Sequence, residues 1–241
     1  MLKLCHDWVP HAAVEHEARI ARVIKASGAP IPLAGEVVEV DGRYGIAYER
    51  VSGPSMQELM QEYPSTVAQY SHLLAELHAD LHARCIGTDL PSQRECLRAR
   101  IVTAEALSSV TKTAALERLR RLSEDGHLCH GDFHPGNILM SERGPVIIDW
   151  VDATRGSAAA DVARTWVLLM GHVAYPDTPS WVRTCCEVYL RRYCELRFIT
   201  QSEVEAWIPI VAAARLNENI PEARQWLLSL ALQMTEGEEA R

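Results

Sequence analysis

The sequence predicts an α+β protein, with a small antiparallel sheet near the N-terminus and a mainly helical remainder. Asp41-Gly42 separates two runs rich in β-branched and aromatic residues within 36–51, and Asp-Gly in such a setting is the strongest short signal for a hairpin. From residue 65 onward, most segments carry apolar residues at helical spacing. The exception is 130–149, where a Ser-Glu-Arg-Gly turn joins two short apolar runs and predicts a second hairpin.

One strand and one helix are expected ahead of the first hairpin. Residues 1–5 form a short apolar run with Lys3 at its centre, which predicts a strand. Residues 13–27 have the apolar periodicity of a helix, and this helix contains Glu17. We expect the strand to lie beside the hairpin in a short antiparallel sheet.

The rest of the chain predicts a series of helices. The first is expected to begin at Ser65 or Thr66, either of which could cap it, and to continue through Leu81. Further helical patterns occupy 93–107, 112–122, 158–170, 179–197, 202–217 and 221–234.

Two histidines of the first of these helices, His78 and His82, are four residues apart. Zinc sites of the His-Glu-x-x-His type share that spacing, but there a catalytic glutamate follows the first histidine, and here Ala79 does. We therefore predict structural histidines that pack beneath the 130–137 loop.

Composition sets looser bounds on function. The 241 residues are 48% apolar and 23% charged, which is ordinary for a folded protein with a real core. The net charge of −8 argues against nucleic acid or an anionic membrane as the main partner. The longest apolar stretch, 166–170, is far too short to span a bilayer, and no signal peptide is expected.

The cysteines indicate a reducing compartment. There are seven of them, an odd number, and no two are spaced as Cys-x-x-Cys. This pattern argues against a disulfide framework or a zinc site, so a cytoplasmic location is expected.

The polar residues of 130–149 predict a metal site. Asp132 and Asn137 flank a Pro-Gly turn, and Asp149 directly follows the second apolar run. A hairpin would bring Asp149 back beside Asn137 and place two oxygen ligands at one point. Hard cations such as Mg²⁺ prefer such ligands, usually together with phosphate oxygens.

The same residues carry a resemblance. Protein kinases have His-Arg-Asp followed by Asn five residues after the Asp, and later Asp-Phe-Gly, whose Asp binds Mg²⁺. Here His130-Gly131-Asp132 is followed by Asn137 at that offset and then by Asp149 within Ile-Asp-Trp. This combination resembles the aminoglycoside phosphotransferase family and its small-molecule kinase relatives.

The resemblance covers residues 3–165 and implies a protein-kinase-like fold of two lobes. It implies a reduced N-lobe over residues 1–53 and a helical C-lobe over 54–241 that contains the catalytic loop, 130–137. The reaction implied is transfer of the γ-phosphoryl group of ATP or GTP to a hydroxyl of a small molecule. The sequence does not identify this acceptor.

The resemblance also implies roles in the chemistry. Asp132 would orient the acceptor hydroxyl and take its proton, and His134 would contact the γ-phosphoryl group. Asn137 and Asp149 would hold Mg²⁺. His130 is expected to anchor the loop rather than to take part in the chemistry.

The resemblance also assigns residues to nucleotide binding and to support of the catalytic loop. Lys3 would hold the phosphates and pair with Glu17, for which Glu15 is a rival. Backbone groups of the 48–53 segment, at Glu49 and Val51, would meet the adenine. The carboxylate of Asp161 would brace the catalytic loop, or would instead cap the 158–170 helix.

Two other functions stay open. A pseudokinase would keep the fold and bind a ligand or a partner without catalysis. A zinc hydrolase would use ligands crowded into eight residues, namely His127, Cys129, His130, Asp132 and His134.

The family's glycine-rich phosphate loop has no counterpart here, because it would precede the lysine strand and only two residues do. One expectation is that the natural start lies upstream. The other is that nucleotide binds weakly and that the open edge of the 1–5 strand forms a homodimer.

Overall fold

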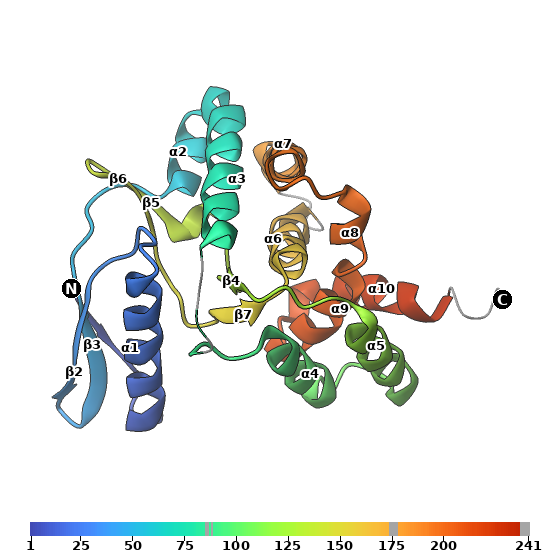
Figure 1. The fold of residues 1–241 in the computed structure, drawn as a ribbon, viewed down its shortest axis with the longest axis horizontal. Helices are drawn as coiled ribbons and strands as arrows, with labels where there is room; N and C mark the ends of the chain where they lie inside the picture. The colour runs from blue at the N-terminus through green and yellow to red at the C-terminus, as the bar shows by residue number, and fades with distance from the viewer. Residues whose placement is uncertain (85–86, 88, 174–177, 237–241) are drawn as a thin grey trace.

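The computed structural model describes residues 1–84, 87, 89–173 and 178–236 (Figure 1). The chain begins with β1 (Leu2–Leu4), α1 (His11–Ala26), β2 (Ala34–Val40) and β3 (Arg43–Tyr48). The middle of the chain forms α2 (Met56–Glu62), the 3₁₀ turn η1 (Pro64–Thr66), α3 (Val67–Ala83), α4 (Gln93–Thr103), α5 (Ser109–Arg121), β4 (His127–Cys129), η2 (Pro135–Asn137), β5 (Ile138–Ser141), β6 (Gly144–Ile147) and β7 (Thr154–Gly156). The remainder forms α6 (Ala158–Val173), α7 (Trp181–Arg197), α8 (Gln201–Glu205), α9 (Ile208–Arg215), η3 (Leu216–Glu218) and α10 (Pro221–Glu236).

The first lobe is a three-stranded antiparallel sheet covered by α1 (Figure 1). The strand order is β1-β3-β2, and Lys3 pairs with Ile46 of β3. The hairpin turn has positive φ at both Asp41 and Gly42, 51° and 75°, which matches the twist of the flanking strands. Val14 and Ala18 of α1 pack with Ile46 in a small core. The predicted strand, helix and hairpin of this region are thus present.

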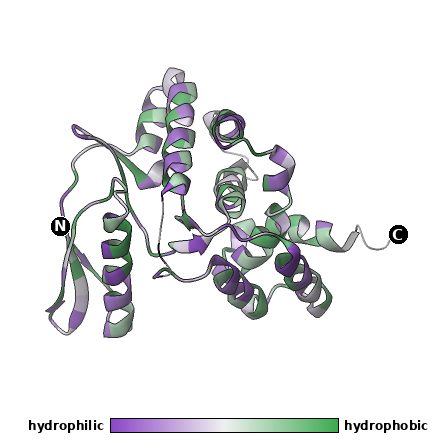
Figure 2. Cartoon of the chain, in the orientation of Figure 1, coloured by the Kyte–Doolittle hydropathy of each residue, from purple (hydrophilic) through white to green (hydrophobic). Residues whose placement is uncertain are grey.

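The second lobe is mainly helical and contains two short antiparallel sheets of two strands each. Helix α3 lies beside α7 and against β4, and α6 contacts both α7 and α9. The predicted hairpin of 130–149 is the pair β5–β6, in which Ile138 is opposite Ile147. Strand β4 pairs with β7, so the segment before the catalytic loop is tied to the segment after Asp149. The helices of this lobe turn their apolar sides inward (Figure 2).

Three local predictions need correction. Helix α2 was not expected, although Ser55 and Glu58 form a capping box whose Ser-x-x-Glu signature is present in the sequence. The hydroxyl of Thr66 does not cap α3 but donates to the carbonyl of Tyr63. The single helix predicted over 202–217 is two helices, α8 and α9, because Pro209 has no N–H to continue the hydrogen-bond ladder and lies in the first turn of α9.

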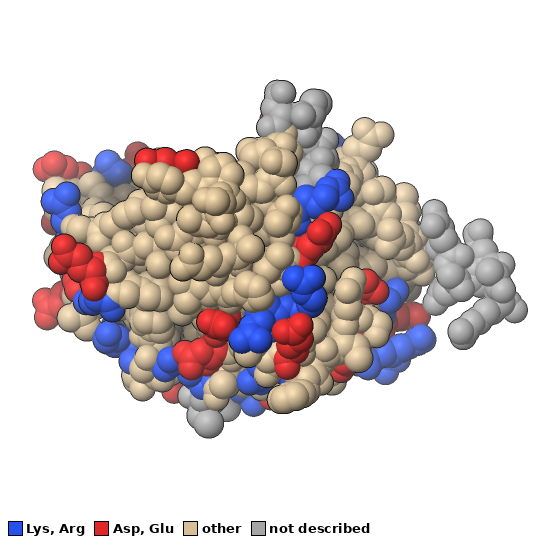
Figure 3. Space-filling model, turned by 90° about the horizontal axis from the view of Figure 1, so that it is seen from above, with Lys and Arg blue, Asp and Glu red and all other residues tan. Residues whose placement is uncertain are grey.

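No helix of the described residues is both long and apolar enough to cross a bilayer. On the face shown in Figure 3, basic and acidic side chains lie next to one another rather than in patches of one sign. Paired charges such as Arg192 and Glu76, 3.0 Å apart, link α7 to α3.

Candidate active site

A cavity of about 390 Å³ lies between the sheet lobe and the helical lobe. Its walls come from β1, α1, the end of β3 and the β5–β6 hairpin, and they are mostly apolar around a polar end. The residues that the sequence assigned to nucleotide and metal all line it, namely Lys3, Glu17, Glu49, Val51, Asn137 and Asp149. The fold therefore gathers at one cavity residues that are up to 146 positions apart in the chain.

Lys3 and Glu17 form an ion pair at the polar end of this cavity. Lys3 Nζ is 2.8 Å from Glu17 Oε1 and 3.8 Å from Asp149 Oδ1. Burial disfavours the charged ammonium, but the hydrogen bond and charge of Glu17 outweigh burial, and the pKa of Lys3 is raised. The rival Glu15 faces His11 and Arg22 instead. The lysine thus stays charged and is aimed between the helix and Asp149.

The segment after β3 forms another wall of the cavity. The carboxylate of Glu49 accepts hydrogen bonds from Arg143 and from the Leu33 N–H, so its oxygens already have protein partners. The backbone N–H of Val51 makes no hydrogen bond within the part of the chain that the structure describes. Val51 lines the cavity, so a backbone donor without a protein partner lies at the wall where adenine was expected.

Asp132 is the partly exposed carboxylate of the catalytic loop. Its Oδ2 accepts a hydrogen bond from Asn137 Nδ2 at 3.1 Å and lies 3.6 Å from His134 Nε2. Its Oδ1 lies 3.7 Å from Arg164 Nη2. Burial alone would raise the pKa of Asp132, but His134 and Arg164 outweigh burial and lower the pKa to about 2. The side chain is an anion at any physiological pH.

Asn137 and Asp149 offer oxygen atoms at adjoining points of the β5–β6 hairpin. The Asn137 amide donates to the carbonyl and the carboxylate of Asp132, which leaves its Oδ1 without a donor among the described residues. The Ile148 N–H donates to the Asn137 carbonyl at 3.0 Å, so Asp149 follows directly beside it. Asp149 has φ 62° and a side chain that is 51% exposed. Two hard oxygen donors facing one cavity fit Mg²⁺.

His130 and His134 differ in their surroundings. His130 is fully buried, with Nε2 donating to the Ile148 carbonyl and Nδ1 accepting from the Asp132 N–H, and its ring lies 4.4 Å from that of Trp150. It joins the catalytic loop to the segment of Asp149, as an anchor would. His134 is partly exposed, and its Nδ1 accepts from the Gly136 N–H. Its Nε2 is therefore the nitrogen directed toward Asp132.

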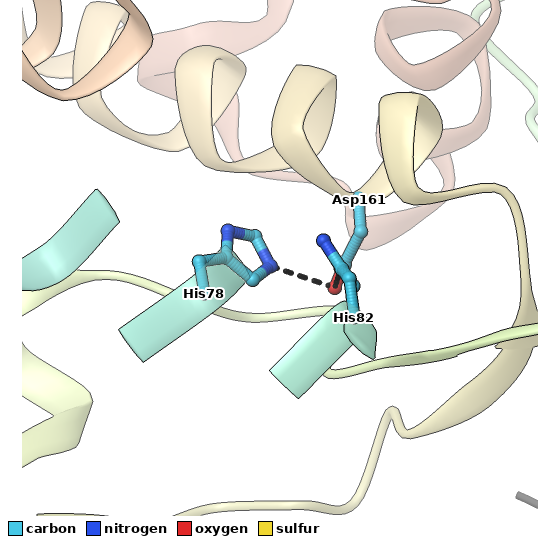
Figure 4. A group of neighbouring side chains, drawn as sticks. All are labelled: His78, His82 and Asp161. Atoms are coloured by element: carbon cyan, nitrogen blue, oxygen red, sulfur yellow. Dashed lines mark hydrogen bonds and ion pairs between the residues drawn. The ribbon is translucent and has the colours of Figure 1, made fainter. Parts of the chain in front are cut away.

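Asp161 holds the catalytic loop from below. Its Oδ1 accepts from the Gly131 N–H at 2.8 Å and its Oδ2 from the His130 N–H at 2.7 Å. His78 and His82 donate to the same Oδ2, at 3.0 and 3.2 Å (Figure 4). Burial would raise the pKa of Asp161, but these partners hold it well below its usual range. The carboxylate braces the loop and does not cap α6.

His78, His82 and Asp161 are also the group of described residues whose spacing could hold a metal ion. Both histidines are fully buried, and their Nδ1 atoms meet the hydroxyls of Tyr189 and Tyr193. Every ring nitrogen thus has a protein partner, as expected of structural histidines. The five residues of the zinc-hydrolase hypothesis form no such group within the described ranges.

The contacts of two residues at the site were not predicted. Tyr48 donates its hydroxyl to Glu17 Oε1 at 3.1 Å and so orients the glutamate toward Lys3. Arg164 donates from Nε to the Gly131 carbonyl and pairs through Nη2 with Glu218, 2.6 Å away. Arg164 follows Asp161 by three positions in α6, so the helical period puts it on the same face, but only the fold reveals its partners.

Comparisons with known proteins show the family of the chain and proteins of similar fold. A model of the phosphotransferase enzyme family matches residues 1–199. No curated protein sequence matches the chain.

Solved structures of similar fold include kinases of several acceptors. A thermostable mutant of aminoglycoside phosphotransferase APH(4)-Ia, in ternary complex with ADP and hygromycin B, has a TM-score of 0.64 at 17% identity, covering 92% of this chain and 82% of that one. Amicoumacin kinase hAmiN in complex with AMP-PNP, Ca²⁺ and Ami has a TM-score of 0.61 at 14% identity, and the match covers 98% of this chain and 81% of that one. Choline kinase from Cryptosporidium parvum has a TM-score of 0.55 at 12% identity, and the match covers 99% of this chain and 82% of that one. At these identities the likeness shows the two-lobed fold.

Proposed function

Because the chain belongs to the phosphotransferase enzyme family, and so acts on hydroxyl groups, we propose that it transfers the γ-phosphoryl group of ATP or GTP to a small molecule. The observation that carries this proposal is the convergence of Lys3, Asn137 and Asp149 on one cavity whose polar end adjoins Asp132. A cation for the phosphates, oxygen donors for Mg²⁺ and a carboxylate for the acceptor are the parts that phosphoryl transfer needs.

The nucleotide would occupy the cavity of about 390 Å³ between the lobes. The apolar walls suit a purine ring, and the Val51 N–H and the backbone at Glu49 lie where its polar edge would be read. Lys3, held by Glu17, would then contact the phosphates at the polar end. When bound through Asn137 and Asp149, Mg²⁺ would neutralise charge on the phosphates.

Asp132 would act on the acceptor. The bond from the acceptor oxygen to phosphorus forms as the bond from phosphorus to the leaving diphosphate breaks, and the hydroxyl proton passes to Asp132. A carboxylate with a pKa of about 2 is a weak base, so its main contribution is to orient the hydroxyl, and the proton moves late. His134 Nε2, beside Asp132 Oδ2, would donate to the transferring group.

Replacement of Asp132 tests the proposal. We expect Asp132→Asn to fold and to bind nucleotide, but to turn over roughly 10²- to 10⁴-fold more slowly, the range for a positioned group that orients the hydroxyl and takes its proton. The measurement is ADP release with a library of hydroxyl compounds, and the exposed Asp80→Asn serves as the matched control. Wild-type turnover by Asp132→Asn on a true acceptor would refute this role. Mg²⁺-dependent nucleotide binding without ADP release, for any acceptor or for water, would instead indicate a pseudokinase.

A further inference from the structure

A groove of about 700 Å³ lies on the helical lobe between α6, α7 and the turn that leads to α8. Its floor is apolar and consists of buried or half-buried side chains, among them Trp166, Met170, Leu190 and Ile199. Its rim is charged, and the charged residues of the rim that the structure describes all belong to α7. An apolar centre within a polar rim is the usual arrangement of a protein–protein interface.

Helix α7 is fixed on its other side. It lies beside α3 at the edge of the helical lobe (Figure 1), and the hydroxyls of its buried Tyr189 and Tyr193 meet the Nδ1 atoms of His78 and His82. The charged residues of the groove are about half a turn of helix away from these tyrosines, so they face outward. The outward side of α7 is therefore a preformed surface.

The charges of this outward side alternate in sign at every fourth residue. Their order along α7 is Arg183, Glu187, Arg191 and Glu195. Glu195 lies 3.5 Å from Arg192. The other three form no ion pair with any residue that the structure describes, although side chains four apart on a helix can meet. They are thus available to pair with another chain.

A second copy of this chain carries the matching pattern. When two copies of α7 lie antiparallel about a two-fold axis at Tyr189, Arg183 faces Glu195 of the partner subunit. Glu187 then faces Arg191 of the partner subunit. Each pair occurs twice, because a two-fold interface uses the same surface of both copies. A parallel arrangement would instead set like charges opposite one another, so the pattern favours the antiparallel one.

Phe198 adds an exposed aromatic ring beside the groove. It directly follows α7, it is 96% exposed, and its φ of 53° is one that bulky residues rarely adopt. Glycine or asparagine usually occupies such a position at the end of a helix. In the antiparallel pair, Phe198 lies toward the start of the partner's α7, where contact with the second copy removes the ring from water.

We propose that α7 and its groove form the interface of a homodimer in which two copies of α7 pack antiparallel about a two-fold axis. The apolar floor and Phe198 supply the buried area, and the alternating charges set the orientation. The cavity between the lobes shares no lining residue with this groove, so association does not require bound nucleotide.

Charge reversal tests both the surface and the orientation. Sedimentation velocity of the parent protein over a wide range of concentrations should show a reversible equilibrium of monomer and dimer. Arg191→Glu and Glu187→Arg each place like charges opposite one another at two symmetric points. We therefore expect the dissociation constant of each variant to rise by about 10-fold or more.

Two rescues distinguish lost charge pairing from a general defect. The double variant Glu187→Arg/Arg191→Glu again has opposite charges across the axis and should dimerise as the parent does. An equimolar mixture of the two single variants should form a heterodimer, because every charge of one variant then meets its opposite on the other. Two variants that had simply failed to fold would not do so.

Phe198→Ser should raise the dissociation constant by roughly 10- to 100-fold, since each copy loses one buried aromatic ring. Arg121→Glu is the control. It reverses an exposed charge of α5 that is paired with Glu117, and it should associate as the parent does. Circular dichroism checks that each variant is folded.

A parent protein that is monomeric at every concentration would overturn the inference. A dimer whose dissociation constant is the same in Arg191→Glu and Phe198→Ser as in the parent would also overturn it, because another surface, such as the edge of β1, would then form the dimer. A mixture of the two single variants that contains no heterodimer would overturn the antiparallel arrangement.

Discussion

Three buried histidines, His78, His82 and His130, support the 130–137 loop. Each has a partner at both ring nitrogens: Nε2 donates to a carboxylate or a carbonyl, and Nδ1 meets a hydroxyl or an N–H. Burial lowers the pKa of His82 to about 3, with the neighbouring His78 adding to the effect, and burial likewise lowers the pKa of His130. In the unfolded chain such rings titrate near pH 6.5.

As the pH is lowered, the protein should therefore lose stability at pH values well above those at which carboxylates titrate. Below about pH 6.5 these histidines become protonated in the unfolded chain, whereas His82 and His130 stay unprotonated in the folded protein. The free energy of unfolding therefore falls by up to about 1.4 kcal/mol per pH unit for each ring. Asp161, whose pKa is lowered in the folded protein, is charged in both states above about pH 4. It lowers the free energy of unfolding only below that pH.

Urea unfolding at pH 7.5, 6.5, 5.5 and 4.5 measures this slope. His82→Gln should be less stable and should show a shallower slope, whereas the exposed His72→Gln should keep the parent slope. A free energy of unfolding that does not change between pH 7.5 and 5 would contradict neutral buried histidines.

At the scale of elements, the link between the lobes depends on a close approach of two backbones. Gly53 has φ 145°, and a Cβ at this position would lie 2.1 Å from the Met140 carbonyl oxygen. The Met140 N–H donates to the neighbouring Pro54 carbonyl at 2.8 Å. The link thus contacts β5 directly at Met140, three residues after Asn137.

Gly53→Ala should displace this link. The clash is with backbone rather than with a flexible side chain, and positive φ adds strain, so we expect a loss of about 2 kcal/mol or more in unfolding free energy and weaker nucleotide binding. Denaturant unfolding and nucleotide titration measure the two effects. Gly42→Ala, with positive φ but nothing within 4 Å of its Cβ, should lose only about 1 kcal/mol and bind nucleotide normally. Equal behaviour of the two variants would contradict the steric argument.

At the scale of the whole molecule, a nucleotide bound between the two lobes should stabilise the folded protein. A ligand that binds only the folded state stabilises it by about 2.7 kcal/mol at 100 times its Kd. We expect ADP with Mg²⁺ to raise the melting temperature and Asp149→Ala to remove the Mg²⁺-dependent part of that rise. Asp80→Ala is the control. Equal nucleotide affinity with and without Mg²⁺ in the parent protein would argue against Asn137 and Asp149 as metal ligands.

A homodimer that forms through strand β1 is the other prediction for the whole molecule. β1 is at the edge of its three-stranded sheet, and its residue Leu2 is exposed. An edge strand of this kind can pair with a second copy. Light scattering across protein concentrations should then show a concentration-dependent dimer. A monomer at every concentration would reject pairing through this edge.

Much of this protein was predictable because its signals are local. The Asp-Gly turn, the helical periodicities and the Asp-to-Asn spacing each depend on neighbours in the chain, and the first hairpin, α1 and the β5–β6 pair follow from them. The approach of Asp149 to Asn137 was anticipated from the hairpin, whereas the pairing of Lys3 with Glu17 was anticipated only from the resemblance to kinases. The division of the chain at residue 53 stays a prediction.

Contacts between distant segments could not be read in this way. The pairing of Arg164 with Asp132 and Glu218, and the meeting of Arg100 with Asp152 beside Gly131, join segments whose packing no local pattern specifies. The sequence by itself determined the type of chemistry, because that depends on which polar groups follow which strand. Only the tertiary structure decided which charged groups meet between α4, α6 and α9, because the approach of these helices is set by side-chain packing throughout the helical lobe.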